Sequence, residues 1–131
     1  MNFFDFSITY GPKFSSAAIT TAQVFVYSAL LAVIISIIFG IMRLSKNIII
    51  QVLATVYIEF YRGTSLIIQM FWIYYVLPLF GIPLPALLAG VLALGMNFGA
   101  YGAEVLRAGI LAVPKGQWEG AHALNFSKAK R

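Results

Sequence analysis

The sequence contains no cysteine, a single histidine and few charged residues. The absence of cysteine excludes disulfides and cysteine-based metal sites. His122 stands alone, without a carboxylate at metal-ligand spacing, so no metal site is expected. Only 10% of the 131 residues are charged and 61% are hydrophobic, whereas soluble domains carry about 25% charged residues. The composition therefore excludes an ordinary soluble domain.

Long stretches without charge predict membrane-spanning helices. Val24–Met42 and Pro85–Ala103 are each nineteen residues without a charged side chain, and Leu66–Phe80 adds fifteen. About 20 apolar residues in a helix cross the roughly 30 Å hydrocarbon layer. Ile48–Phe60 extends the middle stretch on its N-terminal side. We therefore predict an all-α, polytopic membrane protein of one domain, residues 1–131, with three transmembrane helices near 18–42, 56–80 and 84–108.

The residues before the first span are predicted to form an amphipathic lead-in and not a cleaved signal. They carry Asp5 and Lys13 in place of a basic leader region. The apolar run that follows is longer than the roughly 7–15 residues of a secretory signal. The phenylalanines of this segment are expected to rest at the outer membrane interface, namely Phe3, Phe4, Phe6 and Phe14.

Basic residues are distributed unequally around the spans. Eight of the nine flank the first connection or the end of the third span: Arg43, Lys46, Arg62, Arg107, Lys115, Lys128, Lys130 and Arg131. Cytoplasmic loops carry an excess of Lys and Arg, so we expect the N-terminus outside and the C-terminus in the cytoplasm. The net charge of +5 is thus a topogenic signal. The sequence has no soluble module that carries a stripe of basic residues, so no nucleic-acid partner is expected.

The third predicted span has two different sides. At about 100° per residue, Gly95, Gly99 and Gly102 fall in one narrow sector. Gly95 and Gly99 form a Gly-x-x-x-Gly pair, which lets another helix approach closely, so these glycines are predicted to pack against a helix. Polar side chains at membrane depth face a protein interior or an aqueous path, because exposure to lipid is costly. The opposite side carries such residues, namely Asn97, Tyr101 and Glu104.

Each polar residue of this span has a structural and a functional interpretation. Glu104 lies near the cytoplasmic end, where an ion pair with Arg107 or with a basic residue of the second span competes with direct contact to a solute. Asn97 is deeper, and pathway lining and interhelical hydrogen bonding are equally consistent with its position. For Tyr101, packing is a more common role than contact with a ligand.

The second span repeats this polar pattern. Four residues have i, i+3, i+7 and i+10 spacing and would share one helix face: Arg62, Ser65, Gln69 and Trp72. Glu59 lies one turn before Arg62 and can neutralise it. One interpretation is an ion pair with polar packing above it, and the other is a polar path from Arg62 towards Gln69. The segment 63–65 can also break the helix, which at membrane depth is tolerated only where the backbone lines a cavity or is buried.

A short polar segment follows the third span. Pro114 and Gly116 mark the exit from the span, and Glu119–Leu124 predicts one or two turns of helix. Asn125 can supply the left-handed stop that helices take from Gly or Asn. A compact helix at a membrane face, small on one side and charged on the other, is suited to docking in a groove of another protein.

Three segments carry motifs that one protein family has in this same order along the chain: Tyr57–Gln69, Gly99–Ile110 and Val113–Glu119. They resemble the permeases of polar amino acid ABC importers of the histidine/glutamine/arginine type. Glu119–Asn125 is similar to the Glu-Ala-Ala…Gly cytoplasmic loop through which such a permease engages its ATPase. The resemblance extends from about residue 20 to the C-terminus. The sequence departs from the family at Gly120 (usually Ala), Asn125 (usually Gly) and Ser65 (usually Pro), and it stops before the Ile-x-Leu-Pro that closes the family loop and before the last two membrane helices.

The resemblance implies a permease subunit of an ATP-driven importer for polar amino acids or related compatible solutes, in the bacterial cytoplasmic (inner) membrane. The implied partners are an ATP-binding cassette ATPase, a second permease copy or paralogue, and an extracytoplasmic solute-binding protein. No Gly-x4-Gly-Lys-Ser/Thr motif is present, so ATP and Mg²⁺ are expected in the ATPase, and neither catalysis nor a cofactor is expected here. The alternative is a truncated, inactive or regulatory membrane fragment of such a permease.

The candidate site residues follow from these two lines of reasoning. The resemblance assigns ATPase coupling to four residues of the cytoplasmic segment 113–131, namely Glu119, Gly120, Ala121 and Asn125. The polar faces of the second and third spans supply the residues expected along the translocation path: Arg62, Thr64, Ser65, Gln69, Asn97, Tyr101 and Glu104.

Overall fold

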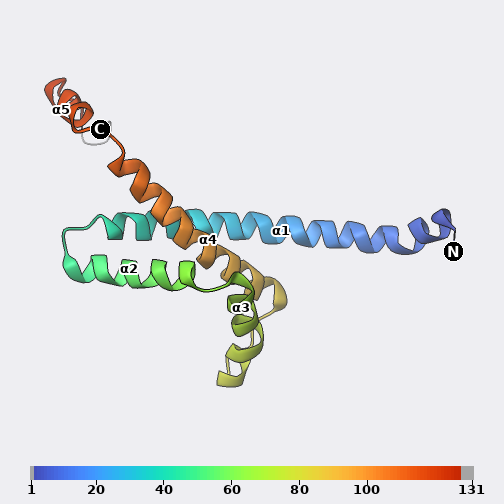
Figure 1. The fold of residues 1–131 in the computed structure, drawn as a ribbon. Helices are drawn as coiled ribbons and strands as arrows, with labels where there is room; N and C mark the ends of the chain where they lie inside the picture. Colours follow the sequence, from blue (N-terminus) through green and yellow to red (C-terminus); the bar gives the residue numbers. More distant parts are fainter. Residues whose placement is uncertain (1, 128–131) are drawn as a thin grey trace.

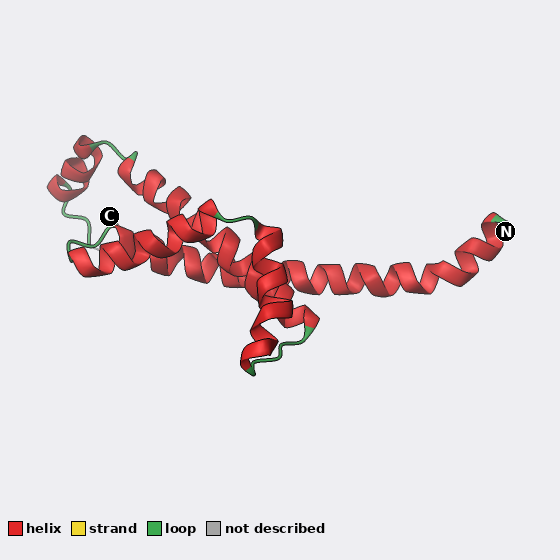
Figure 2. Ribbon diagram, turned by 60° about the horizontal axis from the view of Figure 1, so that its bottom comes forward, coloured by secondary structure: helices red, strands yellow, loops and turns green. Residues whose placement is uncertain are grey.

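The computed structural model describes residues 2–127 as helices joined by short connections (Figures 1 and 2). In chain order these are α1 (Phe3–Arg43), α2 (Ile48–Gly63), α3 (Leu66–Phe71), the π-helical turn η1 (Trp72–Val76), the 3₁₀ turn η2 (Leu77–Phe80), α4 (Ala86–Leu111) and α5 (Lys115–Ala123). Residues 128–131, at the end of the predicted coupling segment, lie outside the described residues, and with them Lys128, Lys130 and Arg131 of the charge argument.

The longest element is α1, with 41 residues. The predicted lead-in is continuous with the predicted span, so the helix begins well before residue 18. α4 crosses the C-terminal half of α1, whereas the N-terminal half of α1 extends past the other helices (Figure 1). The buried apolar positions are mostly alanines, which allow close helix approach: Ala54, Ala89, Ala93, Ala100 and Ala103, with Ile58 as the one large side chain fully buried among the described residues.

The second hydrophobic stretch is bent. α2 and the segment Leu66–Phe80 meet at an angle of 102° across a break of two residues. This corrects the expectation of one helix over 56–80, and it realises the local break considered for residues 63–65. The backbone at Thr64 and Ser65 is extended, and Gly63 precedes them, so three poor helix formers meet at one place.

Within residues 2–127, α1 and α4 are long and apolar enough to cross a membrane, and the bent pair adds a third crossing if it counts as one span. The bent pair is followed by a turn in which Gly81 has a φ of 84°, a conformation that glycine adopts without strain. Pro85 then precedes α4, as suits a residue that cannot donate a backbone hydrogen bond.

Candidate functional site

The glycine side of α4 lies against α1. A Cβ atom placed on Gly95 would come within 2.5 Å of Leu31, and one on Gly99 within 2.6 Å of Ile35. A Cβ on Gly102 would collide with the hydroxyl of Ser36. That hydroxyl donates to Gly99 O at 3.2 Å across the helix pair. The three glycines therefore occupy positions at which a larger residue would push the two helices apart.

The same contact includes a glycine on the other helix. Gly40 of α1 is buried, and a Cβ there would come within 2.7 Å of Leu106. The helical periodicity of the third span could not predict the role of Gly40, because Gly40 belongs to α1. Gly40 would have been found only by asking which residue of the first span faces the cytoplasmic part of the third.

The opposite side of α4 carries Asn97, whose carboxamide is paired with that of Gln69. Both residues are buried, with 4% and 6% of their surface exposed. The Nδ2 of Asn97 donates to Oε1 of Gln69 at 3.0 Å. We call this pair the amide clamp.

The amide clamp binds the backbone where α2 breaks. The Nε2 of Gln69 donates to Tyr61 O at 3.2 Å and to Thr64 O at 3.3 Å, and Asn97 Nδ2 also reaches Tyr61 O at 3.4 Å. The last carbonyls of a helix have no partner within it, and at membrane depth they need one. The clamp supplies these partners. Of the two interpretations of Asn97, the geometry displays interhelical hydrogen bonding.

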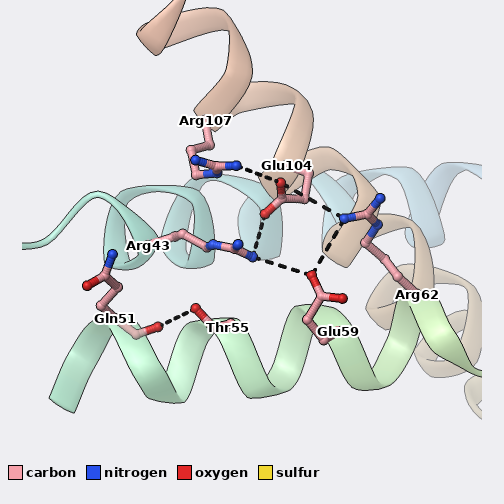
Figure 3. A network of polar contacts seen from close by, with 7 residues as sticks. All are labelled: Arg43, Gln51, Thr55, Glu59, Arg62, Glu104 and Arg107. Carbon is pink, nitrogen blue, oxygen red and sulfur yellow. Dashed lines mark hydrogen bonds and ion pairs between the residues drawn. The ribbon is translucent and has the colours of Figure 1, made fainter. Parts of the chain in front are cut away.

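Glu104 lies at the centre of a second polar group, the ion cluster shown in Figure 3. Its carboxylate is 2.7 Å from Arg43, 3.3 Å from Arg107 and 4.0 Å from Arg62. Glu59 approaches Arg43 and Arg62, each at 3.7 Å. The cluster therefore joins the ends of α1, α2 and α4 with three arginines and two glutamates.

The structural interpretation of Glu104 is the one that the ion cluster displays. Its pairing with Arg107 and with a basic residue of the second span was among the expected alternatives, and so was the pair of Glu59 with Arg62. The shortest contact was missed. In the sequence, Arg43 contributes only to the charge argument for orientation. No local sequence pattern relates it to Glu104, because their contact depends on how α1 crosses α4.

The shared face expected for Arg62, Ser65, Gln69 and Trp72 is wrong, because the helix breaks between the first two of them. Arg62 turns to the ion cluster, and Ser65 is exposed at the start of α3. Trp72 and Gln69 do line a common cavity of about 480 Å³, together with Tyr61, Thr64 and Met96.

Tyr101 is placed between the two polar groups. Its hydroxyl donates to Arg62 O at 3.5 Å, and the Arg62 guanidinium lies 5.7 Å from the centre of its ring. The side of α4 near Met96 is held by another tyrosine, since Tyr57 donates to Met96 O at 2.8 Å. Tyr57 also stacks on Phe39 of α1, with ring centres 4.1 Å apart. Neither contact of Tyr57 was predicted.

α5 stands apart from the crossing of α1 and α4 (Figure 1). The predicted left-handed stop is confirmed, because Asn125 has a φ of 54°. Phe126 N donates to Ala121 O at 3.1 Å and Asn125 N to His122 O at 3.0 Å, the hydrogen bonds of a Schellman turn.

Two of the four candidate coupling residues lie on an open part of α5. Glu119 and Gly120 are exposed, and Gly120 faces open space. Ala121 is half-buried and lines a groove between α4 and α5 with Trp118, Leu106 and Val113. In residues 2–127 no three metal-binding side chains are grouped together.

These features define a polytopic helical membrane protein with two polar groups at helix junctions and a separate terminal helix. No protein-family model matches the chain. A protein of Sinorhizobium fredii (strain NBRC 101917 / NGR234) described as a probable amino-acid ABC transporter permease is 45% identical, over 84% of this chain and 49% of that protein. The L-cystine transport system permease protein of Bacillus subtilis (strain 168) is 34% identical, over 93% of this chain and 52% of that protein.

A solved structure agrees with these relatives. The crystal structure of an amino acid ABC transporter with histidines matches 98% of this chain and 60% of its own, with a TM-score of 0.83 and 38% identity. The chain belongs to the amino-acid ABC transporter permease family. It is a multi-pass membrane protein of this family, whose permease subunits are non-enzymatic transport components. It spans about half the length of the curated relatives that it matches.

Proposed function

We propose that the chain forms part of the translocation path of an ATP-driven importer for polar amino acids or related compatible solutes. The relatives support the solute class, since one is described as an L-cystine permease and the similar solved structure contains histidines. Hydrolysis takes place in a separate ATP-binding cassette subunit, which holds ATP and Mg²⁺. A second permease copy or paralogue completes the path, and an extracytoplasmic solute-binding protein delivers the solute.

The path follows the broken helix. Thr64 and Ser65 are unwound, and backbone at membrane depth is tolerated where it is buried or lines a cavity. The cavity beside this break supports the proposal, since it brings Thr64 and Gln69 together with Tyr61. Asn97 and Gln69 hold the bend in place, and Tyr101, Arg62 and Glu104 continue the polar surface towards the cytoplasmic end.

The observation that carries the proposal is α5, a separate capped helix at the expected end of the third span in a chain of this family. ATP-driven closure of the ATPase subunits moves α5, and the movement is transmitted to α4 across residues 112–114, which join the two helices. In the proposed orientation of the chain, the N-terminus is outside and α5 lies in the cytoplasm. Lys115, at the start of α5, is then on the side where the positive-inside rule expects basic residues.

Gly120 provides the test. Because Gly120 faces open space in the chain itself, Gly120→Leu should leave insertion and folding intact while it blocks a close approach by the ATPase. We expect strongly reduced co-purification of a co-expressed cognate ATPase. Gly90→Leu is the matched control, because Gly90 also faces open space but lies in the first turns of α4. Asn125→Gly should bind at least as well, because glycine adopts the left-handed conformation more readily.

Crosslinking between this chain and the ATPase tests the coupling role directly. The chain has no cysteine, so single cysteines at 117–125 can be paired with single cysteines in the ATPase groove. We expect crosslinks on the side of α5 that carries Glu119 and Gly120. The absence of a crosslink from every position would contradict the coupling role and favour the alternative, a membrane segment that inserts, and pairs with a complete permease, without transport of its own.

A further inference from the structure

The N-terminal part of α1 carries large apolar side chains that are exposed. Phe3, Phe4 and Phe14 have 83%, 77% and 65% of their surface exposed. In Figure 1 this part of the helix extends beyond α2 and α4. It carries little charge, since Asp5 and Lys13 are its only charged residues. A segment of this kind needs an apolar environment other than the packed helices.

The length of α1 indicates where this segment lies relative to the membrane. At 1.5 Å per residue, its 41 residues extend about 60 Å, twice the roughly 30 Å of a hydrocarbon layer. α1 and α4 run parallel, because Gly40 lies beside Leu106 and Leu31 beside Gly95. Towards the N-terminus, Thr20 and Thr21 still share a groove with Leu94 of α4. Residues 3–14 therefore lie past the membrane level at which α4 begins.

Aromatic side chains of this segment form one face. The spacings of three, four and four residues place four of them within about 80° around the helix, namely Phe3, Phe6, Tyr10 and Phe14. The rings of Phe6 and Tyr10 lie 4.8 Å apart, and Lys13 Nζ lies 5.3 Å from the Tyr10 ring. Asp5, Phe4 and Ile8 are on the side away from this face, so Phe4 does not share it as expected from the sequence, and Thr9 lies at its flank.

The helix has the means to bend between this segment and the span. Pro12 cannot donate to the carbonyl four residues before it, which weakens the helix at that turn. Ser15 donates to Gly11 O, Thr20 to Ser16 O and Thr21 to Ala17 O, and such side-chain bonds bend helices. Figure 2 shows the N-terminal end curving away from the axis of α1.

We propose that residues 3–14 form an interfacial anchor whose partner is the lipid surface. The helix bends within 11–21, and the segment lies along the membrane with the face of Phe3, Phe6, Tyr10 and Phe14 beneath the headgroups. Aromatic residues favour this layer, and helices of this kind rest about 5–10 Å into the boundary between headgroups and acyl chains. Lys13, at the margin of the aromatic face, extends its ammonium group to the lipid phosphates. The anchor sets the depth of α1 in the membrane and requires no other subunit.

Spin-label depth measurements test the anchor, and the cysteine-free chain makes them direct. Single variants Phe6→Cys and Tyr10→Cys report on the aromatic face, and Asp5→Cys and Ile8→Cys on the opposite face. Each is labelled with a nitroxide in phosphatidylethanolamine/phosphatidylglycerol vesicles, and its collisions with oxygen and with a water-soluble nickel chelate are compared. We expect positions 6 and 10 at about 5–10 Å below the phosphates, and positions 5 and 8 in water.

Two results would overturn the anchor. Equal exposure of all four labels to the nickel chelate would mean that α1 continues straight into water. Exclusion of both collision partners, with dipolar broadening between labels, would mean that a second copy covers the face. A matched pair of variants checks the register: Phe3→Ser with Phe6→Ser should bring a label at 10 into water, whereas Phe4→Ser with Ile8→Ser, off the aromatic face, should leave it at its depth. These readouts need neither the ATPase nor a particular orientation, so they are independent of the proposed transport function.

Discussion

At the scale of single residues, two polar groups determine how the helices of this chain meet, and they differ in kind. The amide clamp of Gln69 and Asn97 is neutral and buried, and it satisfies backbone carbonyls that the break in α2 leaves free. The ion cluster around Glu104 is charged and only partly buried, with 18% of the side chains of Glu104 and Arg43 exposed. Removal of one member should therefore have different consequences in the two groups.

Asn97→Ala should weaken the bend between α2 and α3. It leaves the Gln69 carboxamide oxygen without the Asn97 donor, and interhelical hydrogen bonds in membranes contribute about 0.6–2 kcal/mol. We expect a loss of that size in detergent or bicelle unfolding, with assembly retained and transport reduced in the complete importer. Phe98→Ala is the control, because Phe98 is the next residue and is 53% exposed. Equal effects of the two substitutions would contradict the clamp.

Glu104→Gln should destabilise the junction of α1, α2 and α4 more than Glu59→Gln. Glu104 is in contact with three arginines, and removing one partner of a buried ion pair costs up to about 3–5 kcal/mol, which the partial exposure of this site reduces. The Glu59 side chain is 59% exposed and its contacts are longer, so its loss should cost less than about 1 kcal/mol. Thermal unfolding of both variants in the same detergent measures the difference, and the reverse order would show that Glu104 does not organise the cluster.

At the scale of helices, the main contact is that of α1 with the glycine face of α4. Gly99→Leu should separate this pair, because even a Cβ there meets Ile35 at 2.6 Å. The expected result is loss of a disulfide crosslink engineered between the two helices, together with lower yield of folded protein. Gly90→Leu adds the same side chain where α4 faces open space, and the crosslink should persist. A crosslink that survives in both variants would mean that glycine is not needed for the approach.

The elements differ in how far the sequence could predict them. Charge-free runs located α1 and α4, since hydropathy is a local property, and the glycine spacing identified the face of α4 that receives α1. The bend at Thr64 and Ser65 was anticipated as a local break, but its angle was not. That angle depends on hydrogen bonds from Gln69 and Asn97 to the freed carbonyls, and Asn97 is far from the break in the sequence. For the same reason Arg43, which lies at the end of α1, could not be assigned to Glu104.

At the scale of the whole molecule, the chain leaves much apolar surface uncovered. Phe25, Val56 and Val105, on three different helices, are 72%, 62% and 72% exposed. In a multi-pass membrane protein this surface meets lipid or other membrane helices and is not a sign of an open fold. The polar groups of the chain lie instead at the junctions of helices. There Asn97 and Gln69 are kept away from lipid, and Glu104 is paired with arginines.

The orientation of the chain is the prediction on which the coupling role of α5 depends. Arg43 and Arg107 of the ion cluster lie at the same end of the parallel helices α1 and α4, whereas Lys13 lies near the other end of α1. Basic residues near span ends remain in the cytoplasm. Asn2→Cys should therefore react with an impermeant maleimide in intact cells, and Ser127→Cys only after permeabilisation. The chain contains no other cysteine to label. The reverse pattern would place α5 outside, where no ATPase could reach it.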